Sequence, residues 1–132
     1  QKIIPNLMLH VVTGIDYHEL PDHVNSCDLI LLTSKNEGWP NSIKEALACN
    51  LPFVSTDVSD LLVIANKESS CRVVKRDPYL IAENIVEVTK LNQENNLMEH
   101  VKEMDIVTTT TKLLNLYKDT IENYMSIFRK DI

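Results

Sequence analysis

The sequence predicts an α/β domain in which helices cover a parallel sheet. Two observations predict it: several short runs are apolar at every position rather than at every second one, and helical patterns stand between these runs. The chain has 132 residues, 44% of them hydrophobic, which suits a single domain with its own core. Because ligands of such sheets bind at the carboxyl ends of the strands, the loops that follow the strands are the places to look for a site.

The predicted strands are short runs of apolar and β-branched residues. The first covers residues 7–13, ends at Gly14 and is expected to be a buried strand. The second covers residues 29–33 and the third residues 53–56, and residues 71–74 are expected to form a fourth short strand. The loops that then qualify as ligand sites by position are residues 13–17, 34–42 and 56–60.

Helical patterns fill the intervals between these strands. A short helix is expected over residues 17–26, and another over residues 43–49 that ends with Asn50 in a left-handed conformation. Asp77 is expected to cap a helix over residues 78–91, because it directly precedes a proline at the first helical position.

The C-terminal third of the chain is predicted to be helical as well. Residues 92–112 are polar and are expected to hold a short helix and a turn, before a last helix over residues 109–129. One face of that last helix is apolar at helical spacing and consists of Leu113, Leu114, Tyr117, Ile121, Tyr124, Met125 and Phe128.

Composition argues against several kinds of site. Glycine occurs only as Gly14 and Gly38, so no glycine-rich phosphate loop can be written, and a phosphate site must use the N-terminus of a helix. The three cysteines contain no Cys-x-x-Cys pair and the four histidines show no metal-ligand spacing, so no metal site is predicted. A net charge of −6 argues against a nucleic-acid partner. No apolar run approaches the roughly 18 residues of a membrane-spanning helix, so no transmembrane segment is expected.

The segment from Ser34 to Glu45 offers the richest chemistry at the end of a predicted strand. It enters a helix near Pro40, where backbone N–H groups and the helix dipole favour a phosphate or a sugar hydroxyl. Gly38 would let a ligand approach the backbone closely. Glu37 and Glu45 bracket the segment, and a carboxylate can accept two neighbouring hydroxyls of a ribose or a hexose at once.

Simpler interpretations of the same residues stay open on spacing alone. Ser42 and Glu45 match a capping box, which needs no ligand. Trp39 could be an ordinary packing residue beneath the loop, and Gly38 could serve only a tight turn. The residues by themselves therefore do not distinguish a ligand site from a capped helix N-terminus that binds nothing.

A longer stretch around this segment resembles the signature of the family 4 glycosyltransferases, which have the GT-B fold. The signature consists of two glutamates separated by seven residues, then Ala-x-Ala-x-x-x-Pro and a strand that ends near an aspartate, here Asp57. Upstream, Gly14 and residues 20–28 also look like a helix and strand entry of this family, and the resemblance is strong over residues 7–60. The residues that carry the signature are Ser34, Glu37, Gly38, Trp39, Pro40, Asn41, Ser42, Ile43, Lys44, Glu45, Ala46, Leu47, Ala48, Cys49, Asn50, Leu51 and Pro52.

The resemblance implies a hexosyltransferase-type enzyme that transfers a sugar from a nucleotide diphosphate sugar, with retention of anomeric configuration and without a bound metal or cofactor. Glu37 is then the catalytic residue and contacts hydroxyls of the donor sugar, and Glu45 holds the ribose hydroxyls. Backbone N–H groups at the helix start would stabilise the negative charge that develops on the leaving diphosphate. The residues expected to bind the donor are Gly14, Ser34, Glu37, Gly38, Trp39, Pro40, Asn41, Ser42 and Glu45.

The chain departs from the family at two positions. The family often has two consecutive glycines near the donor phosphates after the third strand, where this chain has Val58, Ser59 and Asp60. Asn50 stands where the family often has glycine, but asparagine tolerates the left-handed conformation, so no change of function is expected there.

The resemblance also implies that residues 1–132 form part of a C-terminal, Rossmann-like, three-layer donor domain. The first strand of that domain and the N-terminal acceptor domain have no counterpart in the sequence, so the chain is expected to be inactive alone. The whole enzyme is expected to serve a glycan or lipid-linked acceptor in bacterial surface polysaccharide synthesis, such as O-antigen, capsule or lipopolysaccharide. It is expected in the cytoplasm or peripherally at the inner face of the membrane.

The last helix is expected to cover the core or to favour self-association. The alternative is a non-catalytic nucleotide-sugar-binding or scaffold module.

Overall fold

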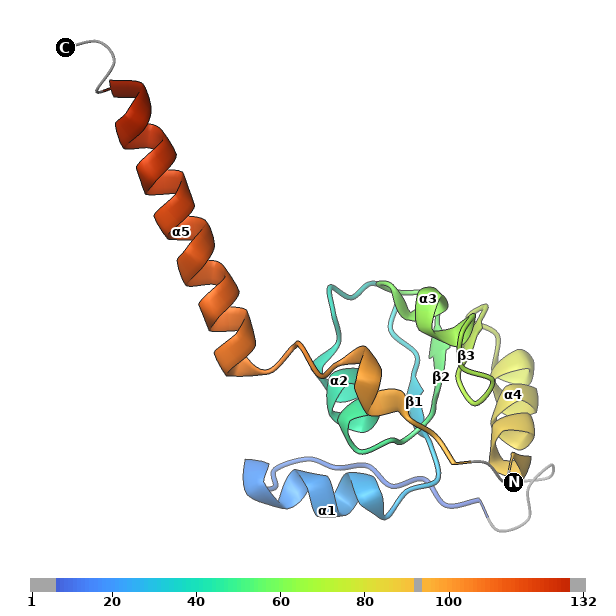
Figure 1. Ribbon diagram of the computed structural model, residues 1–132. Coiled ribbons are helices and arrows are strands. Elements are labelled where there is room, and N and C mark those ends of the chain that lie inside the picture. Colours follow the sequence, from blue (N-terminus) through green and yellow to red (C-terminus); the bar gives the residue numbers. More distant parts are fainter. Residues whose placement is uncertain (1–6, 92–93, 129–132) are drawn as a thin grey trace. The chain divides into compact units, whose positions relative to one another are not determined.

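The structure, a computed structural model, describes residues 7–91 and 94–128 (Figure 1). The chain divides into two compact units, one ending at His100 and the other beginning at Val101. The first unit contains the 3-10 helices η1 and η2, the helices α1 to α4 and the three strands, and α5 belongs to the second. The elements in chain order are η1 (Tyr17–Glu19), α1 (Leu20–Asn25), β1 (Ile30–Leu32), α2 (Asn41–Ala48), β2 (Phe53–Thr56), α3 (Leu61–Ala65), β3 (Arg72–Val74), α4 (Pro78–Lys90), η2 (Leu97–His100) and α5 (Ile106–Phe128).

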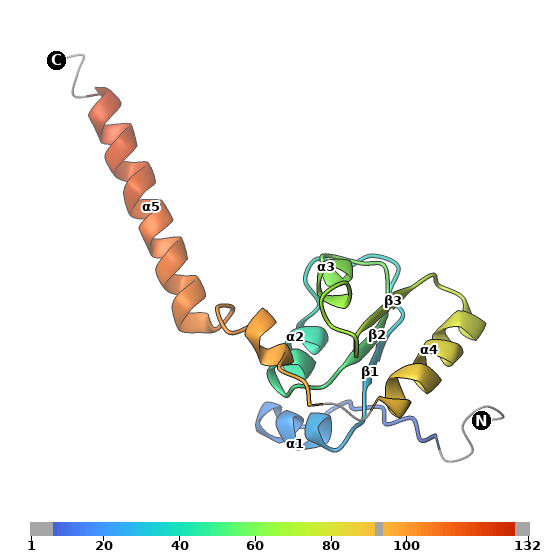
Figure 2. The ribbon, with the colours of Figure 1, turned by 45° about the vertical axis from the view of Figure 1, so that its right-hand side comes forward.

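Within the described residues, three strands form one parallel sheet in the order β1-β2-β3. In its register Leu31 lies opposite Val54, and Val54 lies opposite Arg72. Helix α4 contacts β2 and β3, helix α2 contacts β1, and the sheet stands between these two helices (Figure 2). The predicted α/β class with a parallel sheet is confirmed, and the first unit has three layers.

The core of the first unit is built around β2. All four residues of this strand are buried, including the polar Ser55 and Thr56, as expected for a central parallel strand. Helix α2 adds Ile43 and Leu47, which are completely buried, and α3 adds Leu61. Burying each such leucine or isoleucine side chain contributes about 1.5–3 kcal/mol, so this layer holds α2 and the loop before it against the sheet.

Several predicted helix boundaries are confirmed by their capping groups. The Asp77 carboxylate accepts hydrogen bonds from the backbone N–H groups of Tyr79 (2.8 Å) and Leu80 (3.1 Å), which satisfies two orphan donors of α4. Asn50 follows α2 with a φ of 57°, the left-handed conformation expected of it.

Residues 7–13 are not a strand, and the prediction there is wrong. They follow an irregular path along α1, where the His10 ring lies 5.2 Å from the His23 ring, and Met8 and Leu9 are largely exposed. A strand needs a neighbour for its backbone hydrogen bonds. Within the described residues β1 is the edge of the sheet and pairs with β2 alone, so no neighbour is in place for residues 7–13.

The C-terminal region begins its last helix earlier than predicted. Helix α5 starts at Ile106 because the Asp105 carboxylate accepts hydrogen bonds from the N–H groups of Val107 (2.9 Å) and Thr108 (3.0 Å). The short helix expected before it is the 3-10 helix η2, while residues 92 and 93 lie outside the described part. None of the helices in the described ranges has the length and apolar character that would let it cross a membrane.

Candidate functional site

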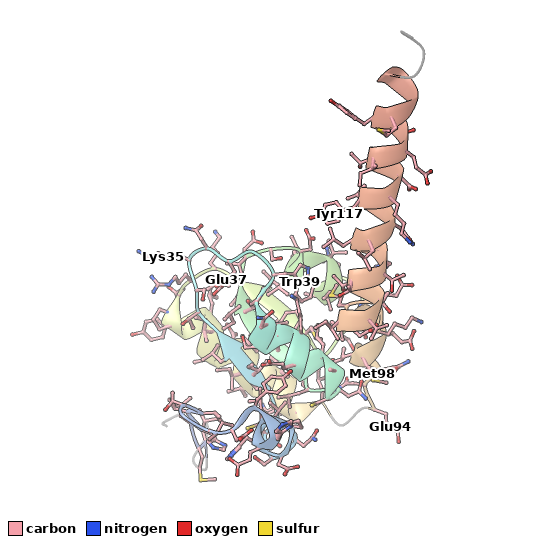
Figure 3. All side chains as sticks on the ribbon, turned by 90° about the vertical axis from the view of Figure 1, so that its left-hand side faces the viewer. Lys35, Glu37, Trp39, Glu94, Met98 and Tyr117 are labelled. Atoms are coloured by element: carbon pink, nitrogen blue, oxygen red, sulfur yellow. The ribbon has the colours of Figure 1, made fainter. Side chains whose placement is uncertain are left out.

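The loop of residues 33–40 connects β1 to α2 at the carboxyl end of the sheet (Figure 1). Within it the Ser34 hydroxyl donates a hydrogen bond of 2.7 Å to Glu37 Oε1, and the Glu37 side chain is exposed. Figure 3 shows Glu37 on this loop together with Lys35 and Trp39. The structure therefore joins two of the predicted site residues and leaves the Glu37 carboxylate open to a ligand.

Two side chains from other strands hold the beginning of this loop. The Thr56 hydroxyl, at the end of β2, donates a hydrogen bond of 2.6 Å to the carbonyl oxygen of Ser34. The Arg76 Nε, just beyond β3, donates one of 3.1 Å to the carbonyl oxygen of Thr33. Sequence reasoning did not find either residue. The available signal was that Thr56 ends one predicted strand and Arg76 follows another, because the carboxyl ends of parallel strands share an edge.

Helix α2 starts without a side-chain cap. Its N-cap is Pro40, an extended residue that can donate no hydrogen bond, and no side chain accepts from the first turn. The backbone carbonyl of Pro40 accepts from the N–H groups of Ile43 and Lys44, both at 3.2 Å. Ser42 lies inside the first turn rather than before it, so the capping-box interpretation of Ser42 and Glu45 is wrong. The helix end keeps its partial positive charge at the exposed residues Asn41 and Ser42.

Lys44 places a positive charge at the same helix start. Its Nζ lies 5.7 Å from the centroid of the Trp39 ring and donates a hydrogen bond of 3.2 Å to Asn41 Oδ1. Trp39 is half-buried, so the packing interpretation of this residue is supported, and its ring also positions a cation. Sequence reasoning gave Lys44 no role, although the three-residue spacing from Asn41 was a readable signal.

The two glycines have different local geometry. Gly14 has a φ of 69°, in the left-handed region, so the turn before η1 favours glycine there. Gly38 has no such φ, and a Cβ built on it would meet no atom within 4 Å. The chain bends at Gly38 and Trp39, but neither the φ of Gly38 nor its surroundings make glycine necessary for that turn. What glycine adds at this position is an open face of backbone.

Glu45 lines a cavity of about 170 Å³ next to α1. Burial raises the pKa of the Glu45 carboxyl, and burial together with the Glu45 charge raises the pKa of the Cys49 thiol. Sequence reasoning named Glu45 but missed the cavity, because its other wall depends on how α1 packs against α2. The residues that line it with Glu45 are mostly apolar: Tyr17, Leu20, Pro21, Val24, Ala48 and Cys49.

Most of the predicted site residues thus fall into three neighbouring groups on the segment of residues 34–45. Ser34 and Glu37 form the loop group, Trp39 and Asn41 contact Lys44 at the helix start, and Glu45 faces the cavity. Gly14 precedes η1, and η1 contributes Tyr17 to the cavity wall. Among the described residues, no three His, Cys, Asp or Glu side chains are grouped so that they could hold a metal ion.

Two comparisons with known proteins both point to glycosyltransferases. The model of the family described as "Glycosyl transferases group 1" matches residues 5–90. The Bacillus subtilis (strain 168) protein named "Putative teichuronic acid biosynthesis glycosyltransferase TuaC" is 32% identical over 77 residues. Those residues are 58% of this chain and 20% of that relative, so the chain spans about a fifth of the relative's length. No solved structure matches the chain significantly.

Proposed function

Because this chain belongs to the group 1 glycosyl transferases, we propose that residues 34–45 bind the nucleotide diphosphate sugar from which such an enzyme takes its sugar. The observation that carries the proposal is the setting of Glu45. Its carboxylate lines an apolar cavity and follows a helix start that has no side-chain cap. One short segment thereby offers groups for each part of the donor: nucleoside, diphosphate and sugar.

The cavity suits the nucleoside part of the donor. The Glu45 carboxylate can accept hydrogen bonds from both ribose hydroxyls at once. The apolar side chains of Leu20, Pro21 and Val24 offer a surface on which the flat face of a base can pack. The raised pKa of Glu45 fits this role, because a half-buried carboxylate loses part of its hydration, which two ribose hydroxyls would replace.

The start of α2 suits the diphosphate. The exposed N–H groups of Asn41 and Ser42 and the helix dipole favour an anion at this end. Lys44, held by Trp39 and Asn41, adds a full positive charge close by. The open backbone face at Gly38 leaves room for the donor to lie along the loop.

Glu37 suits the sugar and the chemistry. In sugar transfer the anomeric carbon gains positive charge while the leaving diphosphate gains negative charge. A carboxylate beside the sugar stabilises the first, and helix N–H groups stabilise the second without a cation. Retention of configuration, metal independence and the absence of a cofactor follow from the resemblance to family 4 and belong to this proposal, as does the GT-B fold of the whole enzyme.

The acceptor belongs to the proposal for the whole protein. The relative from B. subtilis is named for teichuronic acid biosynthesis, which supports a cell-surface polysaccharide as the product here. Residues 1–132 are then part of a donor-binding domain, and sugar transfer requires parts that bind the acceptor. We expect the chain alone to bind donor and to transfer no sugar. That the whole enzyme acts in the cytoplasm or at the inner face of the membrane stays a prediction.

Calorimetry with UDP and with GDP tests the donor site. We expect one of the two to bind, with the same affinity before and after treatment with EDTA. Glu45→Ala should weaken that binding by about tenfold or more, because it removes charge-assisted hydrogen bonds. The matched control is Glu83→Ala, an exposed glutamate of α4. The site is refuted if neither nucleotide binds or if both variants bind like the wild type.

A further inference from the structure

The loop that carries Glu37 is tied to two strands that take no part in the proposed donor contacts. Thr56 closes β2 and Arg76 follows β3, yet both donate hydrogen bonds to backbone carbonyls in the loop after β1. Loop carbonyls at a surface are usually satisfied by water. Two consecutive carbonyls held by side chains 22 and 43 residues away therefore fix the exit of the chain from the sheet.

Ser34 is the residue that links these ties to Glu37. Its carbonyl oxygen accepts from the Thr56 hydroxyl at 2.6 Å, and its own hydroxyl donates to Glu37 Oε1 at 2.7 Å. A change in the backbone at Ser34 moves the hydroxyl that orients the Glu37 carboxylate. Thr56 is 4% exposed, so water would replace its hydrogen bond poorly.

Arg76, just beyond the outer strand β3, holds the residue before Ser34. Its Nε donates to the carbonyl of Thr33 at 3.1 Å, although its side chain is exposed. An arginine that bonds through Nε has a fixed fork geometry, whereas a lysine would offer one rotating ammonium. Arg76 therefore fixes the Thr33 carbonyl where the chain leaves β1. Thr56 fixes the next carbonyl, that of Ser34.

We propose that Thr56 and Arg76 are positioning residues that act through Ser34 to orient the Glu37 carboxylate toward the donor sugar. This inference rests on the proposed donor site. Neither residue touches the donor. They fix the loop so that Glu37 keeps one geometry, which lowers the entropy that binding and transfer would otherwise cost.

The ligand-free test uses the ¹³C signal of the Glu37 carboxyl carbon in the full 132-residue chain. Ser34→Ala, which removes the hydrogen bond to Glu37, defines the signal of the unheld carboxylate. Thr56→Val and Arg76→Met should move the signal toward that reference. Thr56→Ser and Arg76→Lys, which keep a donor, should restore it at least in part. Thr89→Val is the control, because the Thr89 hydroxyl bonds within α4.

The ligand test compares UDP with UDP-glucose, and GDP with GDP-mannose, in the same variants. Thr56→Val should weaken binding of the nucleotide sugar about three- to tenfold and leave binding of the free diphosphate unchanged. A wild type that binds none of the four probes refutes the donor site and leaves the ligand-free test valid. A Glu37 signal that stays at its wild-type position in both Thr56→Val and Arg76→Met overturns the positioning roles. Should Thr56→Val fail to fold, the exposed Arg76→Met decides alone.

Discussion

At the scale of single residues, Glu45 combines a cost in stability with a use in binding. Burial raises its pKa, so the folded protein holds the proton of this carboxyl more tightly than the unfolded chain does. The stability linked to that proton is fully present below the pKa of Glu45 in the unfolded chain, and it is lost as pH rises through the higher pKa of the folded protein. A carboxylate kept where it destabilises the fold at neutral pH is typical of a residue retained for function.

The first prediction follows because the ionised Glu45 carboxylate destabilises the folded protein at neutral pH. Glu45→Gln, which never ionises, should raise Tm by about one or two degrees at pH 7 and by less at pH 4, where wild-type Glu45 is itself largely protonated. The same variant should bind nucleotide diphosphate less well at pH 7. Thermal unfolding at both pH values measures the effect, with Glu83→Gln as the exposed control. A Glu45→Gln variant that is less stable than wild type at pH 7 would contradict it.

The second prediction concerns Cys49, one turn further along α2. Burial and the neighbouring Glu45 charge raise its pKa, so at pH 8 little of it is the reactive thiolate. Glu45→Gln removes the charge but not the burial, and should speed alkylation of Cys49 by iodoacetamide about twofold or more. Mass spectrometry of the cysteine peptides gives the rate for each thiol. A bound nucleotide diphosphate should slow the alkylation of Cys49 and leave that of Cys71 unchanged.

At the scale of elements, the sequence predicts best where the signal is local. The strand over residues 53–56 and the helix after Asp77 are set by adjacent apolar residues and by a cap, and both are confirmed. The capping-box interpretation at Ser42 failed because Pro40, two residues earlier, already begins the helix. Thr56 and Arg76 were not predicted, because their contacts depend on the order of strands that lie far apart in sequence.

The third prediction concerns the turn after β2, where the family resemblance implies glycines. Ser59 has a φ of 53°, so this backbone adopts the left-handed conformation although its residue is serine. A serine in this conformation is strained by roughly 1–2 kcal/mol, and glycine would relieve that strain. The greater entropy of glycine in the unfolded chain offsets part of this stabilisation. Ser59→Gly should therefore stabilise the protein by about 0.5–1 kcal/mol in urea unfolding.

A matched variant separates conformational relief from a general effect of glycine. Asn66 ends α3 with a φ of −74°, where glycine relieves no strain. Asn66→Gly should lower the free energy of unfolding by roughly 0.5–1 kcal/mol, because only the unfolded chain gains freedom. The same sign of change in Ser59→Gly would show that the left-handed turn carries no strain.

At the scale of the whole molecule, the predicted fold class is right and one predicted strand is wrong. Residues 7–13 have the composition of a buried strand, yet they have no pairing neighbour beside β1 within the described residues. Composition reports which residues favour a strand, whereas pairing depends on which other strands are present. Helix α5 of the second unit shows the same difference between local and long-range information. Its local pattern predicts the helix, but the pattern does not say what its apolar face packs against.

The fourth prediction concerns that face of α5. Val107, Leu114, Tyr117 and Ile121 are exposed and recur three, four or seven residues apart, which is the spacing of helices that pair side by side. The isolated chain should therefore associate as its concentration rises. Sedimentation velocity should show this for the wild type and for Asn115→Lys, and a monomer for the double variant Leu114→Lys, Ile121→Lys. A wild type that stays monomeric at all concentrations would contradict the prediction.

The donor site is tested most directly by amide NMR of the ¹⁵N-labelled chain during titration with UDP and with GDP. One of the two should shift the signals of Asn41, Ser42 and Glu45 together with those of cavity residues such as Val24 and Cys49, and should leave α4 and α5 unchanged. Shifts confined to other parts of the chain, or no shifts with either nucleotide, would contradict a donor site between the loop after β1 and the cavity beside α1.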